Sequence, residues 1–150
     1  MIEELLSRYS NHVEFIGDEL TNVRQAGIFG SQIIHLASFA GHCDDIENAL
    51  SAGANIDAIG DLGLSALHYA VLGESLDAVR LLISKGANLT LENEFGETPA
   101  QMARIMGFNN IENILCNFGC IPIGSFDGGE VAKQRWLEFK SIQEGNFLNQ

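Results

Sequence analysis

Histidine and cysteine are the residues of this chain best suited to metal binding or catalysis, and the sequence has four histidines and three cysteines. Cys116 and Cys120 have a C-x3-C spacing, but a zinc site needs a second pair of cysteines or histidines, and none lies nearby. His35 and His68 stand 33 residues apart, outside any H-E-x-x-H or G-x-S-x-G motif. We therefore expect buried thiols, no metal, no cofactor and no catalytic residue. An acid–base pair assembled from distant segments is the one catalytic alternative that the sequence leaves open.

The interval between the two histidines belongs to a repeat that runs through most of the chain. The segment GSQIIHLA at 30–37 recurs as GLSALHYA at 63–70 and as GETPAQMA at 96–103, so corresponding residues are 33 apart. Later in each unit stand Gly53, Gly86 and Gly119, again 33 apart. Repeats of this length indicate an architecture built by stacking one small unit on the next.

Each unit predicts two helices separated by a turn. The first begins after a glycine and a serine or threonine, and Thr98-Pro99 places proline at the first helical position of the third unit. The second ends at the later glycine, because a left-handed C-cap costs little only for glycine. One pair of amphipathic helices cannot bury both of its apolar faces, so neighbouring pairs must stack.

The middle unit carries the closest match to a known family. Its LHYA at 67–70, LDAVRLL at 76–82 and GAN at 86–88 resemble the ankyrin repeat. The resemblance covers residues 22–119 and implies an all-α ankyrin-repeat solenoid of three helix-turn-helix repeats with β-hairpin fingers. It also implies that His35 and His68 are structural and hydrogen-bond the backbone between repeats.

Two departures from the family pattern bear on the local structure. Glu74 occupies the inter-helix position that Gly41 and Gly107 hold in the other units, and Gly73 lies one residue earlier, so a shifted turn is expected there. Gln101 replaces the histidine of the third unit. Terminal repeats are often irregular because they cap the stack.

The chain is predicted to be a single domain, residues 1–150, with a non-repeat segment at each end. In the N-terminal segment, 1–21, four apolar residues share one helical face, which should cover the open end of the stack. They are Ile2, Leu5, Leu6 and Tyr9.

The C-terminal segment, 120–150, is predicted to hold a glycine-rich loop and a helix at about 129–144. Ala132, Trp136 and Phe139 lie on one face of this helix, with Ile142 close to that face. The helix either caps the third repeat by burying Trp136 or presents this tryptophan to a partner. The last six residues are expected to fray.

Charge and hydropathy indicate which class of partner the chain could bind and in which cellular compartment it is expected. With 20 acids against 8 bases, the net charge is -12, which repels nucleic acid and anionic membranes and attracts a basic protein. Simple solubility is the alternative explanation of this charge. No stretch approaches the ~20 apolar residues that span a bilayer, and residues 1–4 lack the basic start of a signal peptide. We expect a cytoplasmic protein.

The resemblance implies that a partner binds a concave face made of the finger tips and the exposed side of the first helices. A bulky apolar residue precedes each tip glycine, and the third finger is acidic. Apolar residues ringed by charge are typical of an interface core with a polar rim; the alternative is that each tip residue packs on the next finger. The predicted partner-binding residues are Ile28, Phe29, Phe39, Ile59, Asp61, Leu62, Leu64, Leu72, Glu92, Glu94, Phe95, Glu97, Ile105 and Met106.

These features favour protein binding over catalysis. Small acidic ankyrin proteins of this kind are similar to immunity proteins encoded beside bacterial toxins. The resemblance therefore implies an antitoxin that neutralises a basic toxin or nuclease-like enzyme, as a monomer or in a 1:1 heterocomplex. Acidic residues would accelerate the encounter with such a partner. A generic ankyrin scaffold or regulatory subunit without an inhibitor role is the alternative.

Overall fold

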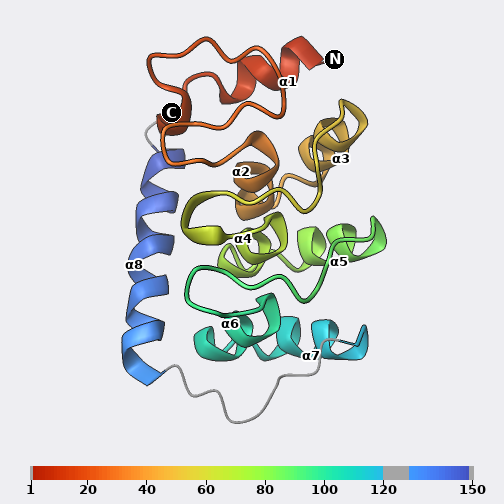
Figure 1. Cartoon of the computed structure of the whole chain (residues 1–150), viewed down its shortest axis with the longest axis vertical. Helices are drawn as coiled ribbons and strands as arrows, with labels where there is room; N and C mark the ends of the chain where they lie inside the picture. The colour runs from red at the N-terminus through yellow and green to blue at the C-terminus, as the bar shows by residue number, and fades with distance from the viewer. Residues whose placement is uncertain (1, 120–128, 149–150) are drawn as a thin grey trace.

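The computed structural model describes residues 2–119 and 129–148, and it shows helical pairs stacked in one column (Figure 1). The predicted all-α repeat architecture is confirmed. The helices are α1 (Ile2–Tyr9), α2 (Ile33–Ala40), α3 (Cys43–Ser51), α4 (Ala66–Leu72), α5 (Leu76–Ser84), α6 (Pro99–Met106), α7 (Asn109–Asn117) and α8 (Gly129–Leu148). Short 3-10 helices span Val13–Phe15 and Asp61–Gly63. None of the described helices is long and apolar enough to cross a membrane.

The first helix of each pair starts where the cap residues predict. In the second repeat the Ser65 hydroxyl accepts the backbone N–H of His68, and in the third the Thr98 hydroxyl accepts that of Gln101. Pro99 is the first residue of α6, where its missing N–H leaves no bond unmade. Gly53, Gly86 and Gly119 follow the second helices with positive φ, as predicted.

The turn between the helices is in register in all three repeats, so the shift expected at Glu74 is wrong. Glu74 itself takes the left-handed backbone, with φ of 54°, beside 74° at Gly41 and 76° at Gly107. Gly73 serves a different purpose: a Cβ there would collide with the carbonyl of Phe39 at the end of α2. Glycine at this position therefore lets the first two repeats approach closely.

The two signature histidines join consecutive repeats, as the family resemblance implies. The backbone N–H of Gln32 donates to Nδ1 of His35 at 2.8 Å, which leaves the ring proton on Nε2. This Nε2–H donates to the carbonyl of Ala58 at 2.8 Å, and that of His68 donates to the carbonyl of Glu97 at 2.9 Å. Each histidine thus caps its own helix and binds the finger of the next repeat.

The fingers are hairpin-shaped loops with little regular strand. In each finger one N–H to carbonyl bond closes the base, from Gly27 to Ser31, Gly60 to Leu64 and Asn93 to Glu97, at 2.8 to 3.0 Å. Within the described residues the one β-bridge pairs Ile59 with Ser65. The fingers also bond to each other, since the N–H of Glu94 donates to the carbonyl of Leu62.

The N-terminal helix covers the first repeat, with Leu5 and Tyr9 buried and Leu6 partly buried against the stack. Ile2, which was predicted on the same covering face, is exposed. Its attachment is also polar. Arg8 and Tyr9 both donate to Asp45 at the start of α3, the tyrosine hydroxyl at 2.8 Å. Asp45 is buried, so this paired carboxylate fixes the position of α1.

Candidate protein-interaction surface

The inner face of the stack is formed by α2, α4 and α6 together with the bases of the fingers, and α8 lies along it (Figure 1). Helix α8 runs past all three repeats in the direction opposite to their order, beginning beside α6 and ending near α2. The helix predicted at about 129–144 therefore exists but extends to Leu148, so the fraying expected from residue 145 does not begin there. The predicted loop at 120–128, with Cys120, lies outside the described residues.

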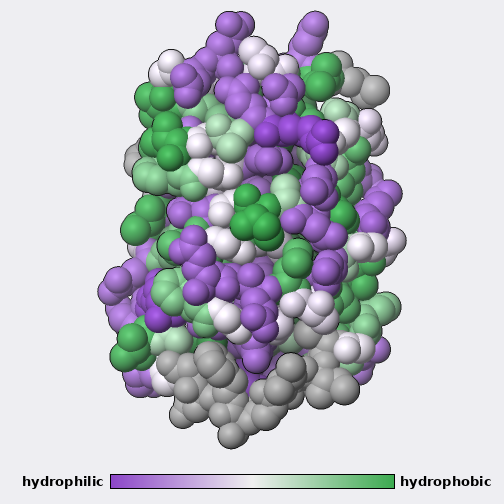
Figure 2. All heavy atoms as spheres, in the orientation of Figure 1, coloured by the Kyte–Doolittle hydropathy of each residue, from purple (hydrophilic) through white to green (hydrophobic). Residues whose placement is uncertain are grey.

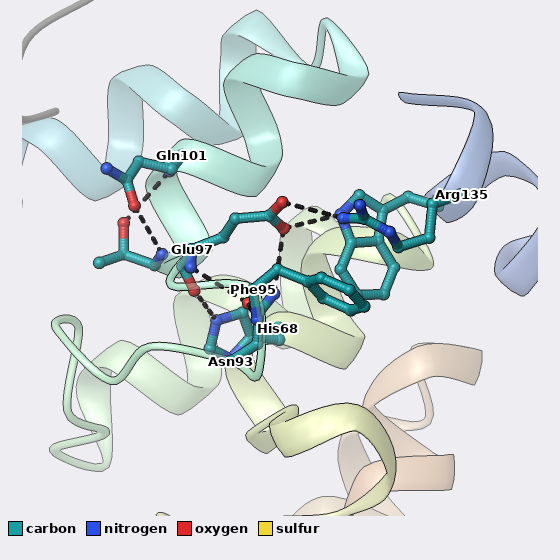
Figure 3. A network of polar contacts seen from close by, with 8 residues as sticks. His68, Asn93, Phe95, Glu97, Gln101 and Arg135 are labelled. Atoms are coloured by element: carbon teal, nitrogen blue, oxygen red, sulfur yellow. Dashed lines mark hydrogen bonds and ion pairs between the residues drawn. The ribbon is translucent and has the colours of Figure 1, made fainter. Parts of the chain in front are cut away.

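The strongest polar contact of α8 is with Glu97 in the third finger (Figure 3). The indole Nε1 of Trp136 donates to Oε2 of Glu97 at 2.7 Å, and Nη1 of Arg135 donates to Oε1 at 3.4 Å. Asn93 donates its side-chain N–H to the same carboxylate at 3.1 Å. Trp136 and Glu97 are both buried. The bond between them pairs the indole N–H with the carboxylate, and burying either group without a partner would cost free energy of folding.

Aromatic contacts continue the attachment along the stack. The guanidinium carbon of Arg135 lies 3.6 Å from the ring centre of Phe95, a close cation–π contact. Further along α8, Phe139 meets Tyr69 of α4 edge to face at 6.1 Å. At the far end, Phe147 stacks on Phe39 of α2 with ring centres 6.0 Å apart.

Helix α8 also reaches the turns on the other side of the inner face. Lys140 pairs with Glu74 at 3.7 Å and lies over the ring of Phe108 at 5.1 Å.

Trp136 is completely buried, which favours the predicted capping role over direct presentation to a partner. The cap, however, covers the side of all three repeats and not the end of the third alone. Ile142, placed close to the buried face by the sequence, is exposed.

The position of α8 changes the status of the predicted binding residues. Five of them are buried inside this chain and cannot contact a partner in this structure, so the expectation that they are accessible is wrong: Phe39, Leu64, Leu72, Glu97 and Met106. Three are partly buried: Asp61, Leu62 and Ile105. Six are exposed: Ile28, Phe29, Ile59, Glu92, Glu94 and Phe95. The physical reason is that the sequence pattern alone does not show which segment covers the inner face.

Comparison with known proteins agrees with this architecture. Residues 34–127 match the family model described as ankyrin repeats (3 copies). This chain belongs to the ankyrin-repeat family. A comparison with curated proteins found no match. Membership indicates a protein–protein interaction module, so the exposed part of the repeats is the place to look for partner contacts.

We define the finger surface of these ankyrin repeats as the exposed apolar residues Ile28, Phe29 and Ile59 with the acids Asp61, Glu92 and Glu94. The three apolar side chains are 57%, 56% and 50% exposed, although all are large. Figure 2 shows hydrophilic side chains around separate apolar groups on the face it presents. Phe95 differs from Phe29 because Arg135 and Trp136 pack against its ring.

The first finger is held by a carboxylate that the sequence analysis missed. Glu14 is buried, and its Oε2 accepts the backbone N–H of Phe29 at 3.1 Å. Burial raises the pKa of Glu14, and nearby Asp61 raises it further. Burial also raises the pKa of Asp61. The glycine at 27, whose missing Cβ would collide with Glu14, was the only sequence signal of this contact.

The groups with catalytic potential are occupied structurally in the ankyrin stack. Burial lowers the pKa of His12, His35 and His68 to about 4, so these rings are neutral at pH 7. Cys43 and Cys116 are half-buried and not fully buried as predicted. Their partial burial raises the pKa of both thiols, which makes them poor nucleophiles. Within residues 2–119 and 129–148, no group of three or more histidine, cysteine or acidic side chains is arranged to hold a metal ion.

Proposed function

We propose that this ankyrin-repeat protein is a stoichiometric inhibitor that binds a basic enzyme through the finger surface, in the manner of an immunity protein that neutralises a toxin. The observation that carries this proposal is the exposure of Ile28, Phe29 and Ile59 on a surface whose second and third fingers carry acidic side chains. Large apolar residues left in water at loop tips gain free energy when a partner covers them, and aromatic residues commonly dominate such interfaces.

Charge supplies the second part of the argument. The net charge of -12 produces a long-range attraction for a basic partner, and Glu92 and Glu94 place part of it at the third finger. Electrostatic attraction of this kind increases the association rate, while buried apolar contacts slow dissociation. Together they suit a tight inhibitor that must reach its target quickly.

The inhibitor would act by occlusion and needs no chemistry of its own. An enzyme that acts on nucleic acid presents a basic substrate-binding cleft, and the acids of the second and third fingers are complementary to such a cleft. The finger bases are fixed by main-chain bonds and by His35 and His68, so little ordering entropy is lost on binding.

The experiment is affinity capture with the intact chain, followed by kinetics at several salt concentrations. The variant Phe29→Ser removes an exposed apolar anchor, and Phe118→Ser is its matched control, because Phe118 is 64% exposed at the end of α7, away from the fingers. We expect Phe29→Ser to weaken the captured basic enzyme at least tenfold, a loss of about 1.4 kcal/mol, and Phe118→Ser to leave affinity unchanged. The purified complex should lack the enzyme's activity.

The alternative is a scaffold or regulatory subunit that binds without inhibiting. It predicts mainly apolar contact and an association rate that changes little with ionic strength. For the inhibitor, raising the salt from 50 to 500 mM should slow association by about tenfold or more, because the Debye length shrinks severalfold. A salt-independent rate together with an active partner in the complex would exclude the inhibitor proposal.

A further inference from the structure

The net negative charge of the chain comes mainly from the repeats and the N-terminal segment, whereas the net charge of α8 is zero. Residues 1–119 contain 16 of the 20 acids and five of the eight bases, whereas residues 129–148 contain three of each. A helix of zero net charge therefore lies along the inner face of a body whose 16 acids and five bases give a net charge of -11. Coulomb attraction would favour a more basic helix in the same place.

The contacts of α8 show what kind of helix the inner face accepts. Its buried stripe consists of Ala132, Trp136, Phe139, Gln143 and Phe147, which recur at helical spacing. Its cations meet acids of the repeats, Arg135 at Glu97 and Lys140 at Glu74. Its own acids, at 130, 138 and 144, are all exposed and add nothing to this attraction.

The fit is tight at one end of α8 and incomplete at the other. Trp136 is fully hydrogen-bonded, but within the described residues Oε1 of Gln143 and Nε2 of His12 are buried without a hydrogen-bond partner. The ring of Phe147 lies against that of His12. Gly145 has no neighbour that would exclude a Cβ, so it lowers the helix propensity of α8 without a packing reason. The end over the first repeat is thus the weaker one.

We propose that the inner face is a helix-binding groove and that α8 is its resident competitor, displaced by a basic amphipathic helix of the partner. The displacing helix would carry a tryptophan preceded by a cation, with aromatic residues three and eleven positions after the tryptophan, as in Arg135, Trp136, Phe139 and Phe147. This inference rests on the proposed function, because it assigns a second contact to the same basic partner.

Displacement would control affinity through the open fraction of the protein. A ligand that binds only the open groove has its affinity reduced by the fraction of molecules in which α8 is released. Weakening the contacts of α8 must therefore strengthen binding of the external helix. If α8 were only a structural cap, weakening its contacts would lower the stability of the protein without raising its affinity for the external helix.

The experiment uses the full chain and a synthetic peptide of residues 129–148 with the substitutions Glu130→Lys, Glu138→Lys and Glu144→Lys. The peptide keeps the three cations of α8 and has no acid, so it tests charge and pattern together. The protein has one tryptophan, so when it is labelled with nitrogen-15 it gives one indole N–H signal, which reports directly on the bond between Trp136 and Glu97. The unlabelled peptide is silent, and a fluorescent copy measures binding by anisotropy.

We expect the indole signal to leave its bound position in proportion to peptide binding. A peptide with Trp136→Ala, of equal charge, should bind at least about tenfold more weakly, because it lacks the buried anchor. In the full chain, Arg135→Ala should bind the peptide about two- to fivefold more tightly, since it removes the cation–π contact that holds α8. Lys133→Ala, for which the described part of the chain shows no ion pair, is the control for charge and should not change binding.

Failure of this inference can be told apart from failure of the proposed function. If the peptide binds while the indole signal keeps its place, the contact lies on the finger surface; the competition proposal is then wrong and the inhibitor proposal stands. Absence of peptide binding, or tighter binding by Lys133→Ala alone, also overturns it. A dimer in which two copies exchange α8 would keep the indole signal and would equally overturn it, and sedimentation at rising concentration detects such a dimer.

Discussion

Trp136 and Glu97 lie 39 positions apart in the chain, and a 2.7 Å hydrogen bond joins the indole Nε1 of one to the carboxylate of the other. This bond connects α8 to the third finger inside the protein, where both side chains are buried. It converts a residue that the repeat pattern places at a finger base into the main attachment point of the C-terminal helix.

Glu97→Gln tests this attachment. The amide oxygen can take the place of Oε2 and still accept the indole N–H and the Asn93 side-chain N–H. The variant loses the charge that pairs with Arg135, however, and turns its N–H₂ group toward that guanidinium, where two donors face each other. We expect the free energy of unfolding in urea to fall by about 1.5–3 kcal/mol, the usual range for hydrogen bonds to a charged group. The matched control Glu94→Gln alters an exposed acid of the same finger and should change it by less than about 0.5 kcal/mol. Equal effects of the two variants would contradict the assignment.

The helical repeats were predictable because the residues that define them act locally. Glycines, cap residues and Pro99 fix where helices start and end within a few positions, and the 33-residue period repeats that information three times. The stripe of Ala132, Trp136 and Phe139 likewise indicated a helix with one buried face. Local patterns of this kind suffice for the elements and for their stacking order.

The surface was less predictable because its accessibility depends on a contact distant in sequence. Phe39 is buried by Phe147, more than one hundred positions later, and no periodic pattern in either segment records that contact. For the same reason, Glu97 was predicted to be an accessible acid of the third finger, although it is buried. The tips at Phe29 and Ile59 remain exposed because α8 covers the inner face, which leaves them as the candidate interface.

Three buried histidines predict that the protein loses stability in mild acid. Burial lowers the pKa of His12, His35 and His68 to about 4, below the unfolded value of 6.5. The unfolded state therefore binds protons first, and stability present above pH 6.5 is lost as the pH falls toward 4. Each histidine accounts for about 2 kcal/mol by pH 5. Glu14 and Asp61, whose pKa values are raised, act in the opposite sense and recover stability only at lower pH.

Urea unfolding at pH 7.5, 6.5, 5.5 and 5.0 measures this effect. We expect a monotonic fall in the free energy of unfolding across this series. The fall should be smaller in a variant that lacks one of the buried rings, which separates histidine titration from changes in overall charge. A free energy that stays level between pH 7.5 and 5.0 would show that these rings are not buried as described.

The exchange of histidine for glutamine in the third repeat leads to a paired prediction. Gln101 Oε1 accepts the N–H of Thr98 at 2.8 Å, which reproduces the capping bond that Nδ1 of His68 makes to Ser65. Glutamine does not reproduce the second bond of His68, to the carbonyl of Glu97 in the following finger. The third repeat is the last of the three, and in the part of the chain that the structure describes no further finger follows it for this glutamine to bind.

His68→Gln should therefore lower the free energy of unfolding by about 0.5–1.5 kcal/mol, because the ring's bond to the Glu97 carbonyl is lost while that carbonyl keeps its bond from the N–H of Asn93. Gln101→His should be close to neutral. Between pH 7.5 and 5.0, His68→Gln should also lose about 2 kcal/mol less free energy of unfolding than the unsubstituted protein, because the titrating ring is absent. Thermal and urea unfolding of the two variants measure these differences, and equal destabilisation by both would refute the inter-repeat role of the ring.

Neighbouring positions at the second inter-helix turn are expected to respond in opposite directions to substitution. Glu74 has φ of 54° where the other repeats have glycine, so Glu74→Gly relieves left-handed strain of about 1–2 kcal/mol. The exposed ion pair with Lys140 is worth at most about 1 kcal/mol, and added freedom of the unfolded chain offsets part of the gain. We expect a net gain in the free energy of unfolding below about 1 kcal/mol.

Gly73→Ala should instead lower the free energy of unfolding by at least about 2 kcal/mol, because its Cβ collides with the rigid Phe39 carbonyl. Urea unfolding measures both, and destabilisation by Glu74→Gly would show that its pairing with α8 outweighs the strain.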